Sequence, residues 1–282
     1  MTEHDHQPGF AETAAIAAET ANISHDRDAG AVPPGETTPP NPLANEAREY
    51  ALPFVIHVEK ADPPHRTDAI EAAARATLVF LSDPRVTEAD GEWAGAVRRW
   101  TDGRIRKVVR RARGANWRRA EALPGITIVH RSAEVRVYPP VPNDDWPPDL
   151  SRLQVSGTDL EDPGQLPIAP NATPVLYLNP HLSMTAGKAM AQAGHGAQLA
   201  WWEADAEGRS AWKGSGFDLA VRTAEPGQWE GLLASGLPVV QDGGFTEVEP
   251  GSYTVVADLP ALRAPSGLCS RNLLPAQRKQ RT

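Results

Sequence analysis

The 282-residue sequence has one cysteine, Cys269, few aromatic residues and no long apolar run. A single cysteine excludes an internal disulfide and a cysteine-based zinc cluster. No apolar stretch approaches the ~20 residues that span a bilayer. Near the N-terminus, Glu12 and Glu19 interrupt the apolar residues, so a signal peptide is not expected. We therefore expect a cytoplasmic protein with no membrane partner.

Two common hydrolase motifs are also missing from the sequence. There is no His-Glu-x-x-His pair, which would place two zinc ligands on one helix face, and no Gly-x-Ser-x-Gly nucleophile elbow. We therefore expect neither a metal ion nor another cofactor.

Charge is distributed unevenly along the chain. Residues 1–49 hold nine acidic residues and two arginines, which is −7 of the formal net charge of −8. This segment is rich in proline and poor in aromatic residues, so it cannot bury enough apolar surface to offset its ordering entropy. It is predicted to be a disordered acidic tail. The remaining boundaries follow from proline content and composition, and they predict a domain at 50–140, a proline-rich linker at 141–173, a second domain at 174–262 and a flexible basic tail at 263–282.

The two predicted domains show the same succession of strand-like and helix-like segments. Aligning Phe54 with Val175 and Trp117 with Trp229 matches most of them, with nine extra residues in the first half. The sequence therefore predicts an α/β fold of two similar small domains, each with a mixed four-stranded sheet flanked by helices.

The second half carries a polar stripe on a helix of small residues. Lys188, Gln192 and His195 fall within about 60° of one another at 100° per residue. Alanine, glycine and methionine fill most positions between them, so the helix can pack closely and present one polar line to a cleft. In the first half the alignment puts Thr67, Glu71 and Ala74 at these positions. That half is therefore predicted to be a degenerate copy.

A glycine loop about fifty residues later supplies a carboxylate. It runs Gln241-Asp242-Gly243-Gly244-Phe245-Thr246 and is followed by the Pro250-Gly251 turn and a strand-like segment. Ester hydrolysis needs an activated water and donors for the developing oxyanion. Asp242 can orient or deprotonate water, Thr246 can hold it, and the Lys188 ammonium can stabilise the oxyanion or bind a phosphate.

These two motifs resemble the archaeal/eukaryotic-type peptidyl-tRNA hydrolases. The match covers the Thr185–His195 helix start and the Gln241–Val256 loop and strand, within about a third of the chain. The resemblance implies a compact α/β domain that hydrolyses the ester between a peptide and the terminal ribose of tRNA. It assigns catalytic roles to Lys188, Gln192, Asp242 and Thr246. Gly187 and His195, beside them, are expected to contact the substrate.

A basic run is the main candidate for tRNA binding. It extends from Arg98 to Arg119 in the first half and contains one acidic residue, Asp102. Its density favours a phosphate-binding strip, although a solvated face is the alternative. We expect four of its residues to contact tRNA: Arg106, Lys107, Arg110 and Arg111.

Other interpretations of the same residues remain open at this point. Lys188 could be solvated, Asp242-Gly243 an ordinary turn, and Gln192, Thr246 and His195 structural. The chain could be a catalytically silent tRNA- or protein-binding module on the same fold, or a hydrolase of another ester or amide. The degenerate half would suit a monomer that forms a pseudo-dimer within one chain.

Overall fold

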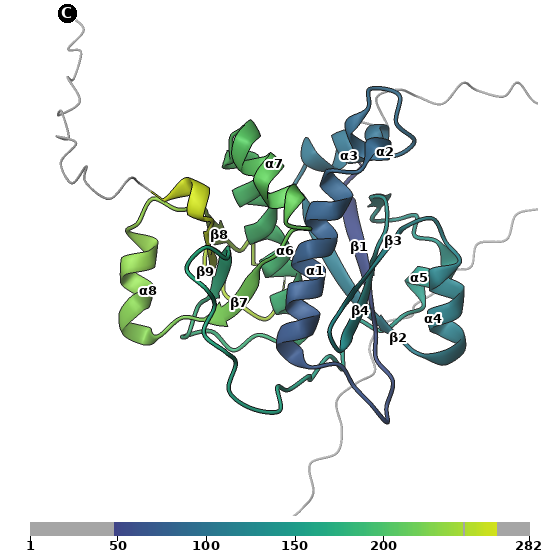
Figure 1. The fold of residues 1–282 in the computed structure, drawn as a ribbon. Helices are drawn as coiled ribbons and strands as arrows, with labels where there is room; N and C mark the ends of the chain where they lie inside the picture. Colours follow the sequence, from purple (N-terminus) through teal and green to yellow (C-terminus); the bar gives the residue numbers. More distant parts are fainter. Residues whose placement is uncertain (1–47, 245, 264–282) are drawn as a thin grey trace, which may run out of the picture. The chain divides into compact units, whose positions relative to one another are not determined.

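The computed structural model of the protein describes residues 48–244 and 246–263. In these ranges the chain forms an α/β fold with two mixed sheets flanked by helices (Figure 1). The predicted acidic tail up to residue 47, and Cys269 with the basic tail from residue 264, lie outside the described residues. Among the described helices, none combines the length and apolar character needed to cross a membrane.

The first sheet is built from residues 50–142. Its strand order is β2-β1-β4-β3, and β5 pairs with β1. β2 is parallel to β1, while β4 is antiparallel to both β1 and β3. The strands are β1 (Tyr50–His57), β2 (Arg106–Ala112), β3 (Ile126–His130), β4 (Ala133–Val137) and β5 (Val141–Pro142). The helices of this half are α1 (Arg66–Leu81), α2 (Pro84–Thr87), α3 (Ala94–Thr101), α4 (Gly114–Glu121) and α5 (Pro148–Ser151).

The second sheet is built from residues 175–258. Its strand order is β7-β6-β9-β8, with β7 parallel to β6 and β9 antiparallel to both β6 and β8. The strands are β6 (Val175–Leu178), β7 (Ala220–Thr223), β8 (Val239–Gln241) and β9 (Tyr253–Asp258). The helices are α6 (Ala186–Glu203), α7 (Ala206–Gly214) and α8 (Pro226–Leu233), followed by a 3₁₀ turn at Pro260–Leu262. In chain order, the four strands of this sheet take the same places as β1 to β4 of the first.

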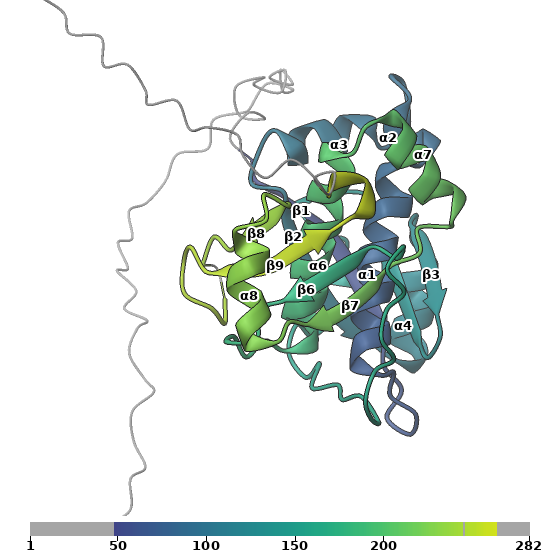
Figure 2. The ribbon, with the colours of Figure 1, turned by 60° about the vertical axis from the view of Figure 1, so that its left-hand side comes forward.

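Helices cover both faces of each sheet. One continuous apolar core holds α1 and α6 between the sheets, where the two helices pack against each other. On the outer face of the first sheet, Val55 packs with Trp117 of α4 and Leu150 of α5. On the outer face of the second, Val256 packs with Trp229 of α8. Figure 2 shows α8 against this sheet. The apolar faces of α1 and α6 are wide, as expected from the many small residues in both helices.

The contact between α1 and α6 depends on a missing side chain. A Cβ on Gly194 would lie 2.9 Å from Thr77 Oγ1 and 3.2 Å from Lys107 Cδ. Since Thr77 is fully buried and its hydroxyl donates to the Ala73 carbonyl, it has little room to move. Glycine at this position therefore sets how closely the two helices approach.

The core corrects one detail of the sequence alignment between the halves. Leu52, Phe54 and Ile56 of β1 share the inner core with Leu176 and Leu178 of β6. Because side chains alternate between the faces of a strand, Phe54 corresponds to Leu176 rather than to Val175. The sequence alignment was therefore wrong by one residue in this strand.

The proline-rich segment at 141–173 contributes to the first half. It contains β5 and α5, and Leu150, Leu153 and Leu160 are buried. Gln154 forms an isolated antiparallel bridge with Arg111 at the outer edge of β2. From there the segment crosses to α6, where the Thr158 carbonyl accepts the Ala186 N–H at 3.2 Å. The part of the segment from Val141 to Thr158 is therefore packed on the fold rather than a free spacer.

Candidate active site

The site is organised by the first turn of α6. Thr185 caps the helix, and its Oγ1 accepts the Lys188 N–H at 3.2 Å. The Gly187 N–H donates to Thr158 Oγ1 at 3.0 Å, and a Cβ on Gly187 would lie 2.9 Å from that oxygen. Gly187 lines the cavity described below, but its N–H is used by the chain itself. Its expected contact with substrate therefore does not go through this N–H group.

The Asp242 loop is held by its own backbone. The Asp242 N–H donates to the Ser252 carbonyl and the Asp242 carbonyl accepts the Gly251 N–H, both at 2.8 Å. Gly244 has a φ of +77°, and a Cβ there would lie 2.4 Å from Pro250 Cγ. The Gly244 N–H donates to Asp242 Oδ1 at 2.7 Å. The glycine and the proline turn therefore fix the direction of the carboxylate.

Two side chains of the α6 stripe meet at this carboxylate. Lys188 Nζ and Gln192 Nε2 each lie 2.7 Å from Asp242 Oδ2. All three residues are buried, with exposed fractions of 9%, 4% and 7% for Lys188, Gln192 and Asp242. A buried ion pair is stable only if further hydrogen bonds satisfy both ions, and the Gln192 and Gly244 donors do this for Asp242.

Thr254 is a member of the site that the sequence did not single out. Its hydroxyl donates to Gln192 Oε1 at 2.6 Å, and the residue is fully buried on β9. The carboxamide of Gln192 is thus held at both ends, by Thr254 and by Asp242. The only sequence signal was a threonine in an otherwise apolar strand, one residue after Tyr253.

Thr246 lies on the same loop, exposed, and lines the cavity. The neighbouring Glu247 accepts the Thr185 N–H and the Thr185 hydroxyl, both at 2.9 Å. The loop is therefore tied to the cap of α6. Thr246 is thus next to the residue that ties the loop to the start of α6, the helix that carries Lys188.

His195 faces a lysine from the other half of the chain. Lys107 Nζ, from β2, lies 3.2 Å from His195 Nδ1 and also contacts Gln198 Oε1. If Nδ1 accepts this hydrogen bond, the imidazole proton is on Nε2. Burial lowers the pKa of Lys107 well below its ordinary value, and burial with the nearby Lys107 and Lys188 charges lowers the pKa of His195 likewise. Both groups are therefore biased toward their neutral forms.

A cavity of about 670 Å³ adjoins these residues. Lys188, Gln192, His195, Asp242 and Thr246 form one wall. The lining also includes the edge strand β2 with the residues before it, from Arg104 to Val109. The structure thus brings all four predicted catalytic residues to one cavity, together with a wall from the other half. A cavity of this size is typical of a small-molecule or cofactor site.

The basic strip differs from the sequence expectation. Arg106 and Lys107 both line the cavity, and Lys107 is buried and directed at His195. Arg110 Nη1 donates to the carbonyls of Ser151 and Leu153 at 3.0 and 2.6 Å. Arg111 Nε donates to the Ser156 carbonyl at 2.8 Å. Lys107, Arg110 and Arg111 therefore contact the chain itself, and binding of tRNA phosphates by the four residues stays a prediction.

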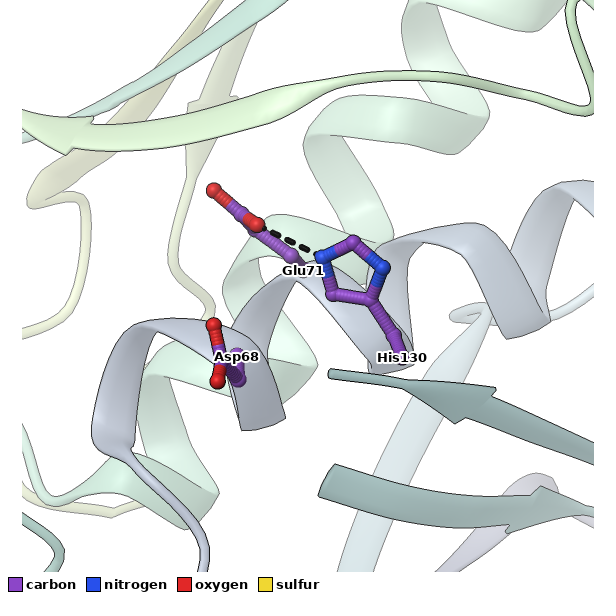
Figure 3. A group of neighbouring side chains, drawn as sticks. All are labelled: Asp68, Glu71 and His130. Carbon is purple, nitrogen blue, oxygen red and sulfur yellow. Dashed lines mark hydrogen bonds and ion pairs between the residues drawn. The ribbon is translucent and has the colours of Figure 1, made fainter. Parts of the chain in front are cut away.

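The first half contains a second buried cluster, which the sequence analysis missed. Asp68 and Glu71 of α1 face His130 at the end of β3 (Figure 3). Glu71 Oε2 lies 2.8 Å from His130 Nε2, and Glu71 is fully buried. Glu71 and His130 are the residues aligned with Gln192 and with Asp242, and they make the corresponding helix-to-loop contact.

This cluster is surrounded by cations of the chain itself. Arg131 Nη1 lies 3.0 Å from Glu71 Oε2 and 3.3 Å from Asp68 Oδ1, and Arg222 Nη1 lies 3.2 Å from Glu71 Oε1. The Ser132 hydroxyl donates to Asp68 Oδ2 at 2.7 Å. Each of the four carboxylate oxygens therefore accepts a protein donor. This donor set fits an internal ion-pair network better than a metal site.

Comparison with models of known protein families and with curated proteins finds no match to this chain. The site is therefore interpreted from its geometry and from the two motifs.

Proposed function

We propose that the protein is a peptidyl-tRNA hydrolase that cleaves the ester between a peptide and the terminal ribose of tRNA. The observation that carries this proposal is the buried Asp242 carboxylate, which Lys188 and Gln192 share on the wall of a cavity of about 670 Å³. These are the residues that the motif resemblance assigns to catalysis.

The proposed reaction uses water that is activated without a metal ion. Asp242 Oδ2 already accepts two hydrogen bonds and Oδ1 accepts one, from Gly244. A carboxylate offers about four lone-pair sites. The remaining site, on Oδ1, can orient a water toward the ester carbonyl, and the Thr246 hydroxyl can hold that water. The Lys188 ammonium then stabilises the negative charge that develops on the carbonyl oxygen.

The remaining residues have supporting roles in this proposal. Thr254 fixes the Gln192 amide, and Gln192 in turn fixes Asp242. His195, with its proton on Nε2, can donate to a ribose hydroxyl in the cavity. Arg104 and Arg106 line the cavity, and in this proposal they contact the terminal phosphates of tRNA. We assign the protein to the cytoplasm, where peptidyl-tRNA is made.

The proposal also covers how the two halves of the chain assemble. The identical strand order of the two sheets supports two copies of one domain, the first of them degenerate. Their α1 and α6 helices pack against each other, as subunits of a dimer would. The protein would therefore act as a monomer with an internal pseudo-dimer and a single catalytic site.

The rival function is a catalytically silent tRNA- or protein-binding module on the same fold. A binder of tRNA would gain from the cationic Lys188 but not from a carboxylate beside it. The fixed Asp242 therefore favours the enzyme.

The test is hydrolysis of an N-acetylated aminoacyl-tRNA by the purified full chain, with and without EDTA. We expect release of the acetylated amino acid at a rate that EDTA does not change. Asp242→Asn and Lys188→Ala should each lower turnover at least ~10²-fold, the scale for loss of a general base or an oxyanion donor. Circular dichroism should show that both variants are folded.

Three outcomes would count against parts of this proposal. A near-wild-type rate for Asp242→Asn would remove Asp242 from the mechanism. A rate abolished by EDTA and restored by a metal ion would contradict the metal-free route. Binding of tRNA by the folded wild-type chain without any hydrolysis would establish the rival function.

A further inference from the structure

The edge of β2 directs main-chain groups toward the cavity. The Ala112 carbonyl accepts the Val58 N–H at 2.9 Å, so Ala112 faces β1. The Arg111 N–H instead donates to the Gln154 carbonyl at 2.8 Å, on the side away from β1. Successive residues of a strand direct their N–H and C=O groups to opposite sides. The main-chain N–H and C=O groups of Lys107 and Val109 therefore point the same way as those of Arg111, away from β1.

The chain itself pairs with this edge at only one position among the described residues. Gln154 forms an isolated antiparallel bridge with Arg111. If the pairing continued, Ser156 would lie opposite Val109. Among the described residues this second pair is not formed: the Ser156 carbonyl accepts Arg111 Nε instead, the chain turns at Gly157, whose φ is +76°, and Thr158 bonds to the start of α6. Lys107 and Val109 then line the cavity together with Lys188 and Gln192.

The corresponding edge in the second sheet shows what this position can bind. The Val221 N–H of β7 donates to Glu71 Oε1 at 3.0 Å, so a carboxylate oxygen from α1 occupies that edge. In the other half, α6 has Gln192 at the position aligned with Glu71. The Gln192 amide is turned toward Asp242 and Thr254 instead. In the part of the chain that the structure describes, no residue hydrogen-bonds the outward N–H of Val109, which corresponds to Val221, so this N–H can meet a ligand in the cavity.

We propose that the peptide part of the substrate adds to the β2 edge as a short extended strand. In this arrangement the Val109 N–H donates to a peptide carbonyl, and the main-chain carbonyls of Lys107 and Val109 accept peptide N–H groups. The ester then lies toward Lys188 and Asp242. The inference rests on the proposed function, because it names the subsite for the peptide of peptidyl-tRNA.

This mode of binding explains how one site could accept any peptide. Main-chain hydrogen bonds are the same for every sequence, so strand addition gives affinity without selecting side chains. It also distinguishes substrate classes. An aminoacyl-tRNA has a free amine and no peptide group, and therefore cannot pair with the edge. Longer peptides make more of these bonds and should be cleaved more efficiently.

The experiment compares kcat/KM for acetyl-trialanyl-tRNA and for acetyl-alanyl-tRNA. We expect wild type to prefer the longer substrate by roughly 3- to 10-fold, the scale of one or two net hydrogen bonds. Val109→Pro removes the outward N–H, at an edge position where proline is tolerated. It should bring the ratio of the two kcat/KM values close to 1. Val109→Ala keeps the N–H and should keep the ratio.

A change in the substrate provides the second test, which does not depend on the folding of a variant. N-methylation of the peptide groups of acetyl-trialanyl-tRNA should abolish the length preference of the wild type. An equal kcat/KM for the two parent substrates, or a preference that survives N-methylation, would overturn the strand subsite. A folded Val109→Pro variant that keeps the preference for the longer substrate would also overturn it. Failure to hydrolyse either substrate would instead overturn the proposed function.

Discussion

At the scale of single residues, Lys107 has an unusual environment. It starts on the first sheet, passes Gly194 of α6 and ends between His195 and Gln198. Its Nζ also lies 5.0 Å from the centre of the Trp100 ring. No carboxylate is among these partners, so the charged form of Lys107 lacks a buried counter-ion there. This explains in physical terms why burial lowers its pKa.

The lowered pKa of Lys107 has a measurable effect on stability. The unfolded chain has the ordinary lysine pKa of about 10.4, so between the two pKa values it binds more protons than the folded chain. The free energy of unfolding should therefore rise with pH in this window, by up to about 1.4 kcal/mol per pH unit. We expect urea denaturation of the wild type from pH 7 to 10 to show this rise and Lys107→Met to lack it.

The control for this experiment is Lys213→Met, which changes an exposed lysine on α7 and should keep the rise. Curves for wild type and Lys107→Met that run parallel across the range would show that Lys107 is charged in the folded state. Below about pH 6.5 a separate effect is expected from His195. Its pKa is also lowered by burial, so stability should fall as the pH decreases through that window.

At the scale of secondary-structure elements, the position of α6 decides whether the site is assembled. This helix carries Lys188 and Gln192 to Asp242 and at the same time packs against α1. Gly196 allows α6 to lie close to the second sheet, because a Cβ there would lie 2.8 Å from Val255 Cγ1. Gly194 fits it to α1 in the same way. The small residues of α6 are therefore spacers that set the geometry of the site.

The glycine spacing can be tested with a double-mutant cycle. Gly194→Ala should destabilise the protein by about 1–3 kcal/mol because the new methyl group meets Thr77 Oγ1. In a Thr77→Ala background the same change should cost less, since the blocking hydroxyl is gone. Thermal or urea unfolding measures both values. Gly214→Ala, at an open position of α7, should be neutral or slightly stabilising. Equal costs of Gly194→Ala in the two backgrounds would contradict the steric explanation.

Local patterns in the sequence predicted much of the structure at the scale of helices, strands and loops. The polar stripe of α6 and the glycine loop have short-range signals, and in the structure Lys188, Gln192 and Asp242 do meet. Contacts between distant segments carry no such signal. Lys107 and His195 are 88 residues apart, and Glu71 and Val221 are 150 apart. Nothing in either local sequence indicates its partner, so Lys107 was assigned to tRNA phosphates. The one-residue error at Phe54 arose because a short strand offers few residues with which to fix a register.

At the scale of the whole molecule, each half supplies a buried group to the other. Lys107 of the first half binds His195 and Gln198 of the second, and Glu71 of the first accepts the Val221 N–H and the Arg222 guanidinium. These contacts add to the apolar core that α1 and α6 share. A face that would bind a second subunit in a dimer of single domains is thus already covered within the chain.

This arrangement predicts the oligomeric state. Light scattering of the full chain should give the mass of one chain, because the α1–α6 face is not available to a second copy. The measurement should be repeated over a tenfold range of concentration and at raised salt, which screens association between oppositely charged surfaces. A mass of two chains under all these conditions would rule out the internal pseudo-dimer.

The joining of both sheets in one polypeptide also changes what a mutation can do. In a symmetric homodimer every substitution appears twice, so a residue cannot be catalytic in one subunit and structural in the other. In this chain the two halves form different helix-to-loop contacts: Gln192 with Asp242, and Glu71 with His130. The first faces a cavity and the second is closed by arginines. A single substitution in this chain therefore changes one of these contacts and leaves the residues of the other as they are.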